Sequence, residues 1–141
     1  MLKVAHIMVI LLAASVMHGC SRNTYQDRTM LCKGSIASWT AGRSDYSNGH
    51  KIGVRVENDR VSTSGNGLIS IEKIRGCRPD ENEFSKKDHM FFDSSGCGAG
   101  DRPSKRTYGS IDYLTKEFQI SSHFDNLNWV EGTFQCEKID P

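Results

Sequence analysis

Residues 52–63 read IGVRVENDRVST and alternate apolar with polar side chains on both sides of a central Asn-Asp pair. Alternation at every second residue is typical of a half-buried strand, and Asn-Asp favours a two-residue turn. Such a turn places Glu57 opposite Arg60 and Val56 opposite Val61, with the charges outside and the valines inside. The stretch therefore predicts an antiparallel hairpin.

The rest of the chain repeats this pattern in short runs separated by Gly, Asn and Asp. After residue 20, no segment keeps a helical spacing of apolar residues for more than about two turns. We expect further strands over 30–39, 68–74, 89–93, 106–113, 118–124 and 129–138, with loops over 40–49, 77–88 and 93–104. The predicted fold is all-β, a small antiparallel barrel or sandwich of about seven or eight strands.

Four of the five cysteines can form two disulfide bonds that would crosslink this sheet. Alternation places Cys32 and Cys136 on the inward faces of the first and last expected strands, which become neighbours if the sheet closes on itself. Cys77 and Cys97 then join the polar loop to the glycine-rich loop. Of the three pairings that four cysteines allow, the sequence favours Cys32 with Cys136 and Cys77 with Cys97.

The amino-terminal segment has the pattern of an export signal that ends at Cys20. Lys3 precedes an apolar run over 4–17, which at about 14 residues is too short to cross a bilayer as a helix and has the size of a signal-peptide core. The tetrapeptide Met17-His18-Gly19-Cys20 resembles the lipobox of bacterial lipoproteins, in which signal peptidase II cuts before a cysteine that carries lipid. This resemblance implies a membrane anchor at Cys20.

Cysteine parity supports the same interpretation, because an odd cysteine in an oxidising compartment leaves a reactive thiol. Acylation of Cys20 leaves four cysteines for two disulfides. A rival cleavage site follows Ala13-Ala14-Ser15, whose small residues suit ordinary signal peptidase and would imply simple secretion. Within the lipoprotein resemblance, Ser21 in place of Asp implies transport to the outer membrane, with the protein facing the periplasm.

These features divide the chain into a signal peptide over 1–19, a lipidated cysteine with a polar tether over 20–28, and one β domain over 29–141. Loss of Lys3 with the signal peptide lowers the 18 basic residues to 17, equal to the 17 acidic residues. A formally neutral chain without a basic patch argues against a nucleic-acid partner.

Candidate catalytic and metal-binding residues lack the spacing that such sites need. Cys97 could act as a nucleophile with His89 or His123 as base, but export and a partner cysteine favour a disulfide. Asp93-Ser94-Ser95-Gly96 lacks the first glycine of a hydrolase nucleophile turn. Two acid-and-histidine sets match no metal-site spacing: Asp88, His89, Asp93 and Asp101, or His123 and Asp125. We therefore expect no enzyme activity, no cofactor and no metal.

Most of the aromatic residues fall at alternating positions of the expected strands and are interpreted as core: Phe91, Phe92, Tyr108, Tyr113, Phe118, Phe124, Trp129 and Phe134. An exposed pair of Trp129 and Phe92 would instead mark a binding patch.

Two functional hypotheses remain from the sequence. The first is a non-enzymatic, membrane-anchored envelope lipoprotein that binds an envelope protein. The alternative is a barrel that binds a small molecule or a lipid in its interior, by analogy with other eight-stranded barrels. Residues 111–117 and 131–136 are similar to segments of small exported bacterial proteins of unassigned function, a resemblance that implies no catalytic residues.

Overall fold

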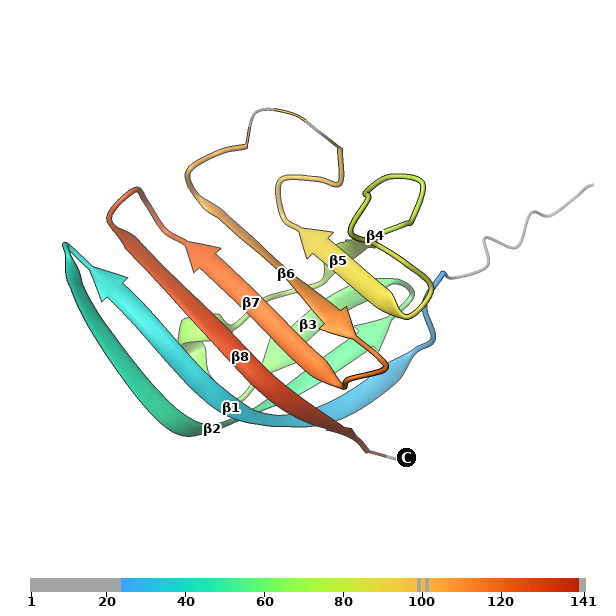
Figure 1. Ribbon diagram of the computed structural model, residues 1–141, viewed down its shortest axis with the longest axis horizontal. Coiled ribbons are helices and arrows are strands. Elements are labelled where there is room, and N and C mark those ends of the chain that lie inside the picture. Colours follow the sequence, from blue (N-terminus) through green and yellow to red (C-terminus); the bar gives the residue numbers. More distant parts are fainter. Residues whose placement is uncertain (1–23, 99, 101, 140–141) are drawn as a thin grey trace, which may run out of the picture.

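The computed structural model describes residues 24–98, 100 and 102–139, and these form eight antiparallel strands closed into a barrel (Figure 1). The strands pair in chain order, and the last strand pairs with the first. This confirms the predicted all-β fold. The elements are β1 (Arg28–Thr40), β2 (Arg43–Glu57), β3 (Arg60–Ser64), the 3-10 helix η1 (Gly67–Ile69), β4 (Ile74–Cys77), β5 (His89–Asp93), β6 (Arg106–Asp112), β7 (Glu117–His123) and β8 (Asn128–Lys138).

The hairpin of β2 and β3 has the predicted register, with Glu57 opposite Arg60 and Val56 opposite Val61. Its two turn residues, Asn58 and Asp59, have φ values of 52° and 57°. Positive φ at both central residues defines the type I′ turn, whose twist matches that of a two-stranded ribbon. Asn and Asp tolerate this conformation better than other side chains, so the local sequence specifies the turn.

The barrel interior is filled with side chains. Phe92, Phe118 and Phe134 are fully buried, and the ring of Phe118 lies 6.0 Å from that of Phe92 and 6.1 Å from that of Phe134. Two inward-facing glycines make room for these rings. A Cβ atom at Gly109 would lie 2.7 Å from Phe92 Cζ, and one at Gly132 would lie 2.5 Å from Phe134 Cε2. The interior is therefore a packed core rather than a ligand cavity.

The two disulfides have the predicted pairing. Cys32 and Cys136 lie directly opposite each other on β1 and β8, with 3.9 Å between their Cα atoms. Their bond therefore joins the two strands at which the barrel closes. Cys77, at the end of β4, bonds Cys97 in the glycine-rich loop, with 5.4 Å between the Cα atoms.

The loop predicted over 40–49 is wrong, because β1 and β2 continue as a paired ribbon to a tight turn at Ala41-Gly42. Most of β2 between residues 43 and 49 is exposed on both faces, since the ribbon extends past the core. Its residues are consequently polar. Gly49, with φ of 80°, is the extra residue of a β-bulge between the pairs Gly34–His50 and Ser35–Asn48.

The strand predicted over 68–74 is also wrong. The chain forms η1 at Gly67–Ile69 and begins β4 only at Ile74. Asn66 starts the helix, because its side-chain oxygen accepts a hydrogen bond from Leu68 N. Ile69 and Ile71 are buried in the hydrophobic core, so their apolar character serves core packing rather than strand alternation.

The segment before β1 belongs to the folded barrel as far as it is described. Residues 24–28 were expected in the tether, but Tyr25 is only 2% exposed and its hydroxyl donates a hydrogen bond to the Cys77 carbonyl. The N–H groups of Thr24 and Tyr25 both donate to the Asp59 carboxylate, at 2.8 Å each. The domain therefore includes these residues. The predicted signal peptide and Cys20 lie outside the described residues.

Candidate functional site

Outward-facing aromatic side chains form a continuous stack across β1, β8, β7 and β6. Trp39 and Trp129 lie opposite each other, with ring centroids 5.1 Å apart and planes 11° from parallel. His123 stacks on the other side of Trp129 at 6.0 Å, and Tyr108 stacks on His123 at 5.7 Å. The guanidinium carbon of Arg106 lies 4.4 Å from the Tyr108 ring centroid. We call these five residues the aromatic stack.

Strand geometry explains the stack. Neighbouring strands are about 4.8 Å apart, which brings rings at adjacent register positions into face-to-face contact. His123 is opposite Trp129 in the β7–β8 pairing, and Arg106 is opposite His123 in the β6–β7 pairing. Aromatic pairs of this kind contribute about 0.5–1.5 kcal/mol each beyond their buried area, so the side chains hold one another in place.

A buried carboxylate fixes the arginine end of the stack. The side chain of Asp93 on β5 is fully buried. One of its oxygens accepts hydrogen bonds from the Ser95 N–H at 2.9 Å and the Ser95 hydroxyl at 2.6 Å. The other oxygen faces Arg106 Nη1 at 3.4 Å and Arg102 Nη1 at 3.5 Å. Asp93 therefore orients the Arg106 guanidinium over the Tyr108 ring.

Shallow grooves flank the stack on both sides. One, of about 290 Å³, is lined by Arg102, Pro103, Arg106, His123, Asn126 and Trp129. The other, of about 300 Å³, lies over the outer faces of β5 to β8 and is lined by Phe91, Tyr108, Gln119, Ser121, Glu131 and Thr133, among others. Phe124 and Leu127, in the turn between β7 and β8, are 49% and 62% exposed. We call the stack, these grooves and the two turn residues the stack surface.

His123 also contacts a hydroxyl group. Its Nε2 atom lies 3.1 Å from the Ser121 oxygen, two residues earlier on the same strand. Ser121 is only 8% exposed, and among the described residues nothing forms a hydrogen bond with Nδ1 of His123. A nucleophilic serine needs an accessible oxygen and a base oriented by a third group. The pair therefore helps position His123 in the stack.

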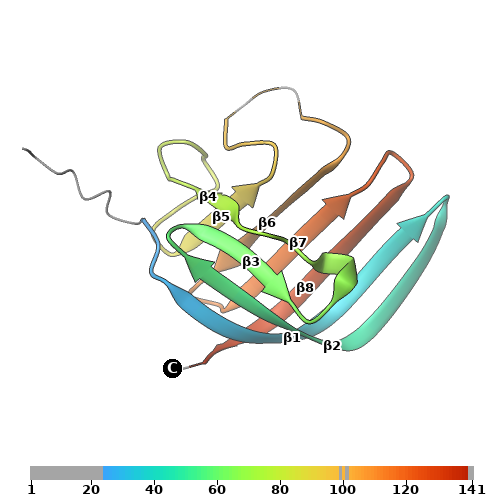
Figure 2. The same cartoon turned by 180° about the vertical axis from the view of Figure 1, so that it is seen from behind.

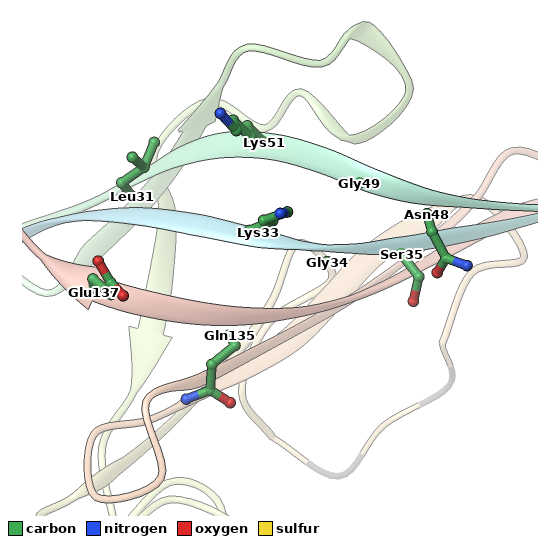
Figure 3. Close-up of a pocket in the computed structure, with 9 residues that line it drawn as sticks. All are labelled: Leu31, Lys33, Gly34, Ser35, Asn48, Gly49, Lys51, Gln135 and Glu137. Carbon is green, nitrogen blue, oxygen red and sulfur yellow. The ribbon is translucent and has the colours of Figure 1, made fainter.

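A third groove, of about 570 Å³, crosses the outer faces of β2, β1 and β8 (Figure 3). Lys33 and Lys51 are directly opposite each other across β1 and β2, and among the described residues neither forms an ion pair. Figure 3 shows their ammonium groups pointing in different directions, with Gln135 and Glu137 on the neighbouring strand β8. Because the polar groups do not converge on one point, this groove is the weaker candidate for a specific site.

Another groove, of about 540 Å³, lies at the opposite end of the barrel from the stack surface. Phe84, Lys86, Lys87, His89, Asp112 and Leu114 line it, among others. His89 Nδ1 lies 3.7 Å from an Asp112 carboxylate oxygen. The N–H groups of Thr115 and Leu114 donate to Asp112 and hold the pKa of that carboxyl below its ordinary value.

The residues that the sequence singled out are spread over the molecule. Cys97 is bonded to Cys77, as predicted. His89 and His123 lie on different strands at opposite ends of the barrel, and Asp101 lies outside the described residues. Within the part of the chain that is described, no three His, Cys, Asp or Glu side chains come close enough to hold a metal ion.

Phe92 faces the core and is fully buried, as its interpretation as a core residue predicts, so Trp129 and Phe92 do not form an exposed pair. Trp129 stacks on Trp39 instead. The sequence contained a signal for that contact. Trp39 lies seven positions after Cys32, and Trp129 lies seven positions before Cys136. Antiparallel strands joined by this disulfide in regular register therefore place the two tryptophans opposite each other.

Comparisons with protein-family models, with curated protein sequences and with solved structures found no match. None of the helical structure within residues 24–139, where it is described, is long and apolar enough to cross a membrane.

Proposed function

We propose that this protein is a non-enzymatic binding module of the cell envelope. A lipid on Cys20 holds it at the membrane, at the periplasmic face of the outer membrane, and the stack surface binds an envelope protein. The observation that carries the proposal is the aromatic stack, in which half-buried rings from four strands meet on the outside of the barrel.

The composition of the stack surface supports a protein partner. Trp, Tyr and Arg are the side chains most enriched at the energetic centres of protein interfaces, and all three occur here in one cluster. Their neighbours in the stack limit their rotamers, so binding orders few additional side chains. Phe124 and Leu127 add exposed apolar area beside the stack.

Two rival functions have less support. An interior ligand needs a continuous cavity, whereas Phe92, Phe118 and Phe134 fill the barrel. Hydrolysis needs an accessible nucleophile with an oriented base and oxyanion donors, whereas Ser121 lies within the sheet and is buried. The outer surface is therefore the better place for function.

Photo-crosslinking in native envelopes tests the protein partner. We expect a benzophenone amino acid at Leu127 to crosslink one defined envelope protein, and the crosslink to disappear when Trp129→Ala removes the centre of the stack. The control position is Leu68, which is exposed to a similar degree but lies in η1 and lines neither of the grooves that flank the stack. Crosslinks at Leu127 that persist in the Trp129→Ala variant, or that occur equally at Leu68, would contradict the proposal.

Mass spectrometry of the mature protein tests the anchor. We expect an N-terminus at Cys20 carrying acyl groups, and loss of membrane association in a Cys20→Ser variant. An N-terminus at Val16 with unmodified Cys20 would instead assign the protein to the simply secreted class.

A further inference from the structure

The two ends of the barrel differ in what they carry. In both Figure 1 and Figure 2, the chain enters the barrel at the end where the loop between β4 and β5 and the turn between β6 and β7 also lie. The turns between β1 and β2 and between β7 and β8 lie at the other end, with the stack surface. We call the first of these the entry end.

The entry end presents two large apolar side chains to solvent. Phe84, in the loop between β4 and β5, is 59% exposed, and Leu114, in the turn between β6 and β7, is 75% exposed. Both line the same groove. Exposed apolar side chains that share a groove mark a surface for a partner or a membrane.

Both side chains sit in segments whose backbone is held by side-chain hydrogen bonds. The Asn82 side-chain oxygen accepts a hydrogen bond from Phe84 N at 2.9 Å. Asp112 accepts hydrogen bonds from Leu114 N at 2.8 Å and Thr115 N at 2.9 Å. The loop and the turn therefore present Phe84 and Leu114 in defined positions.

The position of Thr24 indicates that the entry end faces the membrane. Its N–H and that of Tyr25 are bound to the Asp59 carboxylate in the turn between β2 and β3, which fixes the place where the chain enters the barrel. Cys20 is four residues before Thr24. Four residues span at most about 14 Å even when fully extended, so an acyl chain on Cys20 would hold the entry end close to the bilayer surface.

We propose that the entry end is the membrane-facing surface of this protein, with Phe84 and Leu114 inserted at the lipid interface. This inference rests on the proposed lipid anchor at Cys20. The occupant of the groove is a lipid surface, since the anchor places a bilayer there and apolar loop tips partition into its interfacial region.

Charge contributes little to this contact. Two lysines, Lys86 and Lys87, line the groove together with three acids, Glu83, Asp88 and Asp112. A groove with this mixture has no electrostatic attraction for an anionic bilayer. The contact is therefore apolar, and its strength should change little between low and high salt.

This orientation directs the stack surface away from the membrane. Lys138, near the entry end, lies nine positions after Trp129 of the stack along β8. An extended strand of that length spans about 30 Å. The stack surface would then face the periplasmic space, where an envelope protein can reach it.

Quenching by brominated lipids tests the orientation. The full-length lipidated protein is reconstituted into vesicles of phosphatidylethanolamine and phosphatidylglycerol with bromine on the acyl chains. Both natural tryptophans, Trp39 and Trp129, belong to the stack. We expect their fluorescence to equal that in vesicles without bromine. Strong quenching of these two residues would overturn the proposed orientation.

A matched pair of variants supplies the positive signal. In a Trp39→Phe, Trp129→Phe background, Phe84→Trp places the single tryptophan at the entry end, and Leu127→Trp places it at the opposite end. We expect at least a twofold loss of fluorescence for Phe84→Trp and none for Leu127→Trp, at low and at high salt. Equal quenching of the two variants, or quenching of Leu127→Trp alone, would contradict the inference.

The same sample separates this inference from the anchor on which it rests. Flotation of the vesicles with acylated protein shows that the anchor is present, whatever the quenching result. Protein that neither carries acyl groups nor floats would remove the anchor and the inference together. Protein that floats, with an unquenched tryptophan at position 84, would remove the inference alone. Flotation with quenching at position 84 and not at position 127 supports both.

Discussion

Asp93 is the residue on which the arginine end of the aromatic stack depends. Its buried carboxylate binds the Ser95 N–H and hydroxyl and faces Arg106 and Arg102. A buried charge with this many partners has a defined geometry, and its removal leaves the partners unpaired. The residue therefore links the glycine-rich loop after β5 to the outer surface of β6.

We expect Asp93→Ala to lower the free energy of unfolding by about 1–3 kcal/mol, because it removes hydrogen bonds and leaves the Arg106 guanidinium without its anion. Urea denaturation measures the change. The control is Asp80→Ala, since Asp80 is exposed and, within the described part of the chain, forms an ion pair only with Arg78. Its effect should lie within about 0.5 kcal/mol. Similar losses for both variants would contradict the importance of burial.

Gly109 is required where it stands because a side chain has no room there. A Cβ atom would lie 2.1 Å from the Gln119 carbonyl oxygen and 2.7 Å from the Phe92 ring. We expect Gly109→Ala to destabilise the protein by about 1–3 kcal/mol through overpacking. Gly98→Ala is the control, because nothing lies within 4 Å of its Cβ position. Thermal and urea unfolding of the two variants provide the comparison, and equal stabilities would argue against the packed interior.

Asp112 makes the free energy of unfolding depend on pH in the acidic range. Hydrogen bonds from Thr115 N and Leu114 N lower its pKa in the folded state. A carboxyl whose pKa is lower in the folded state than in the unfolded state stabilises the fold. This stabilisation is fully present when the pH is above the pKa of the unfolded state, about 3.9, and it is lost as the pH falls through the pKa of the folded state. We expect Asp112→Asn to make the loss of stability below about pH 4 shallower. Unfolding free energies measured over this range should differ in slope, and parallel curves would contradict the assignment.

At the scale of elements, the sequence predicted best where the local pattern and the fold agree. Residues 52–63 alternate cleanly, their turn residues suit a type I′ turn, and the structure has the predicted register. The strand over 43–49 could not be predicted this way, because a ribbon exposed on both faces shows no alternation. The apolar residues at 69 and 71 led to the opposite error, a strand predicted over 68–74 although β4 begins only at Ile74. They belong to the core but lie in η1 and the irregular segment that follows it.

The same distinction explains how much of the candidate site was predictable. The inward positions of Cys32 and Cys136 followed from alternation, and their pairing fixes the contact of Trp39 with Trp129. The remainder of the stack depends on the β6–β7 and β7–β8 registers, and no covalent bond within the described residues specifies those. Asp93 could not be identified as buried, because its burial depends on the loop that folds over it.

The outer part of β2 is an unusual element because it has only one neighbouring strand. β3 pairs with Gly53–Glu57 alone, whereas β1 pairs along the whole of β2. Free strand edges invite pairing with other chains, and proteins oppose this with bulges and charged side chains. Here the bulge at Gly49 interrupts the edge, and the Asp45 carboxylate accepts a hydrogen bond from the Tyr46 N–H at 2.9 Å.

We expect Asp45→Val to increase self-association, because it frees the Tyr46 N–H and adds a side chain that favours strands. Sedimentation velocity over a range of concentrations should show dimers or larger species that the unmodified protein lacks. Asp80→Val makes the same chemical change in the loop between β4 and β5 and should remain monomeric. A monomeric Asp45→Val protein would show that the bulge alone protects the edge.

At the scale of the whole molecule, the two disulfides constrain the unfolded chain to different extents. The bond from Cys32 to Cys136 spans 104 residues, and the bond from Cys77 to Cys97 spans 20. The chain-entropy relation assigns about 5 kcal/mol to a loop of the first size and about 3 kcal/mol to one of the second. The longer bond also lies where the barrel closes, so it preserves the pairing of β1 with β8.

We therefore expect Cys32→Ala with Cys136→Ala to destabilise the protein more than Cys77→Ala with Cys97→Ala, by about 1–2 kcal/mol. Guanidinium denaturation of the two double variants measures the difference. A larger loss for the shorter bond would mean that local packing around the loop outweighs closure of the barrel.

The position of the stack across the closure of the barrel has a consequence for how the protein matures. Trp39 belongs to the first strand, whereas Trp129 belongs to the last. On the proposed route of export and lipidation, a chain that is still being translocated lacks β8, the strand that completes the stack. Recognition of the proposed partner would then begin only after translocation is complete, and a truncated copy without β8 would not compete for that partner.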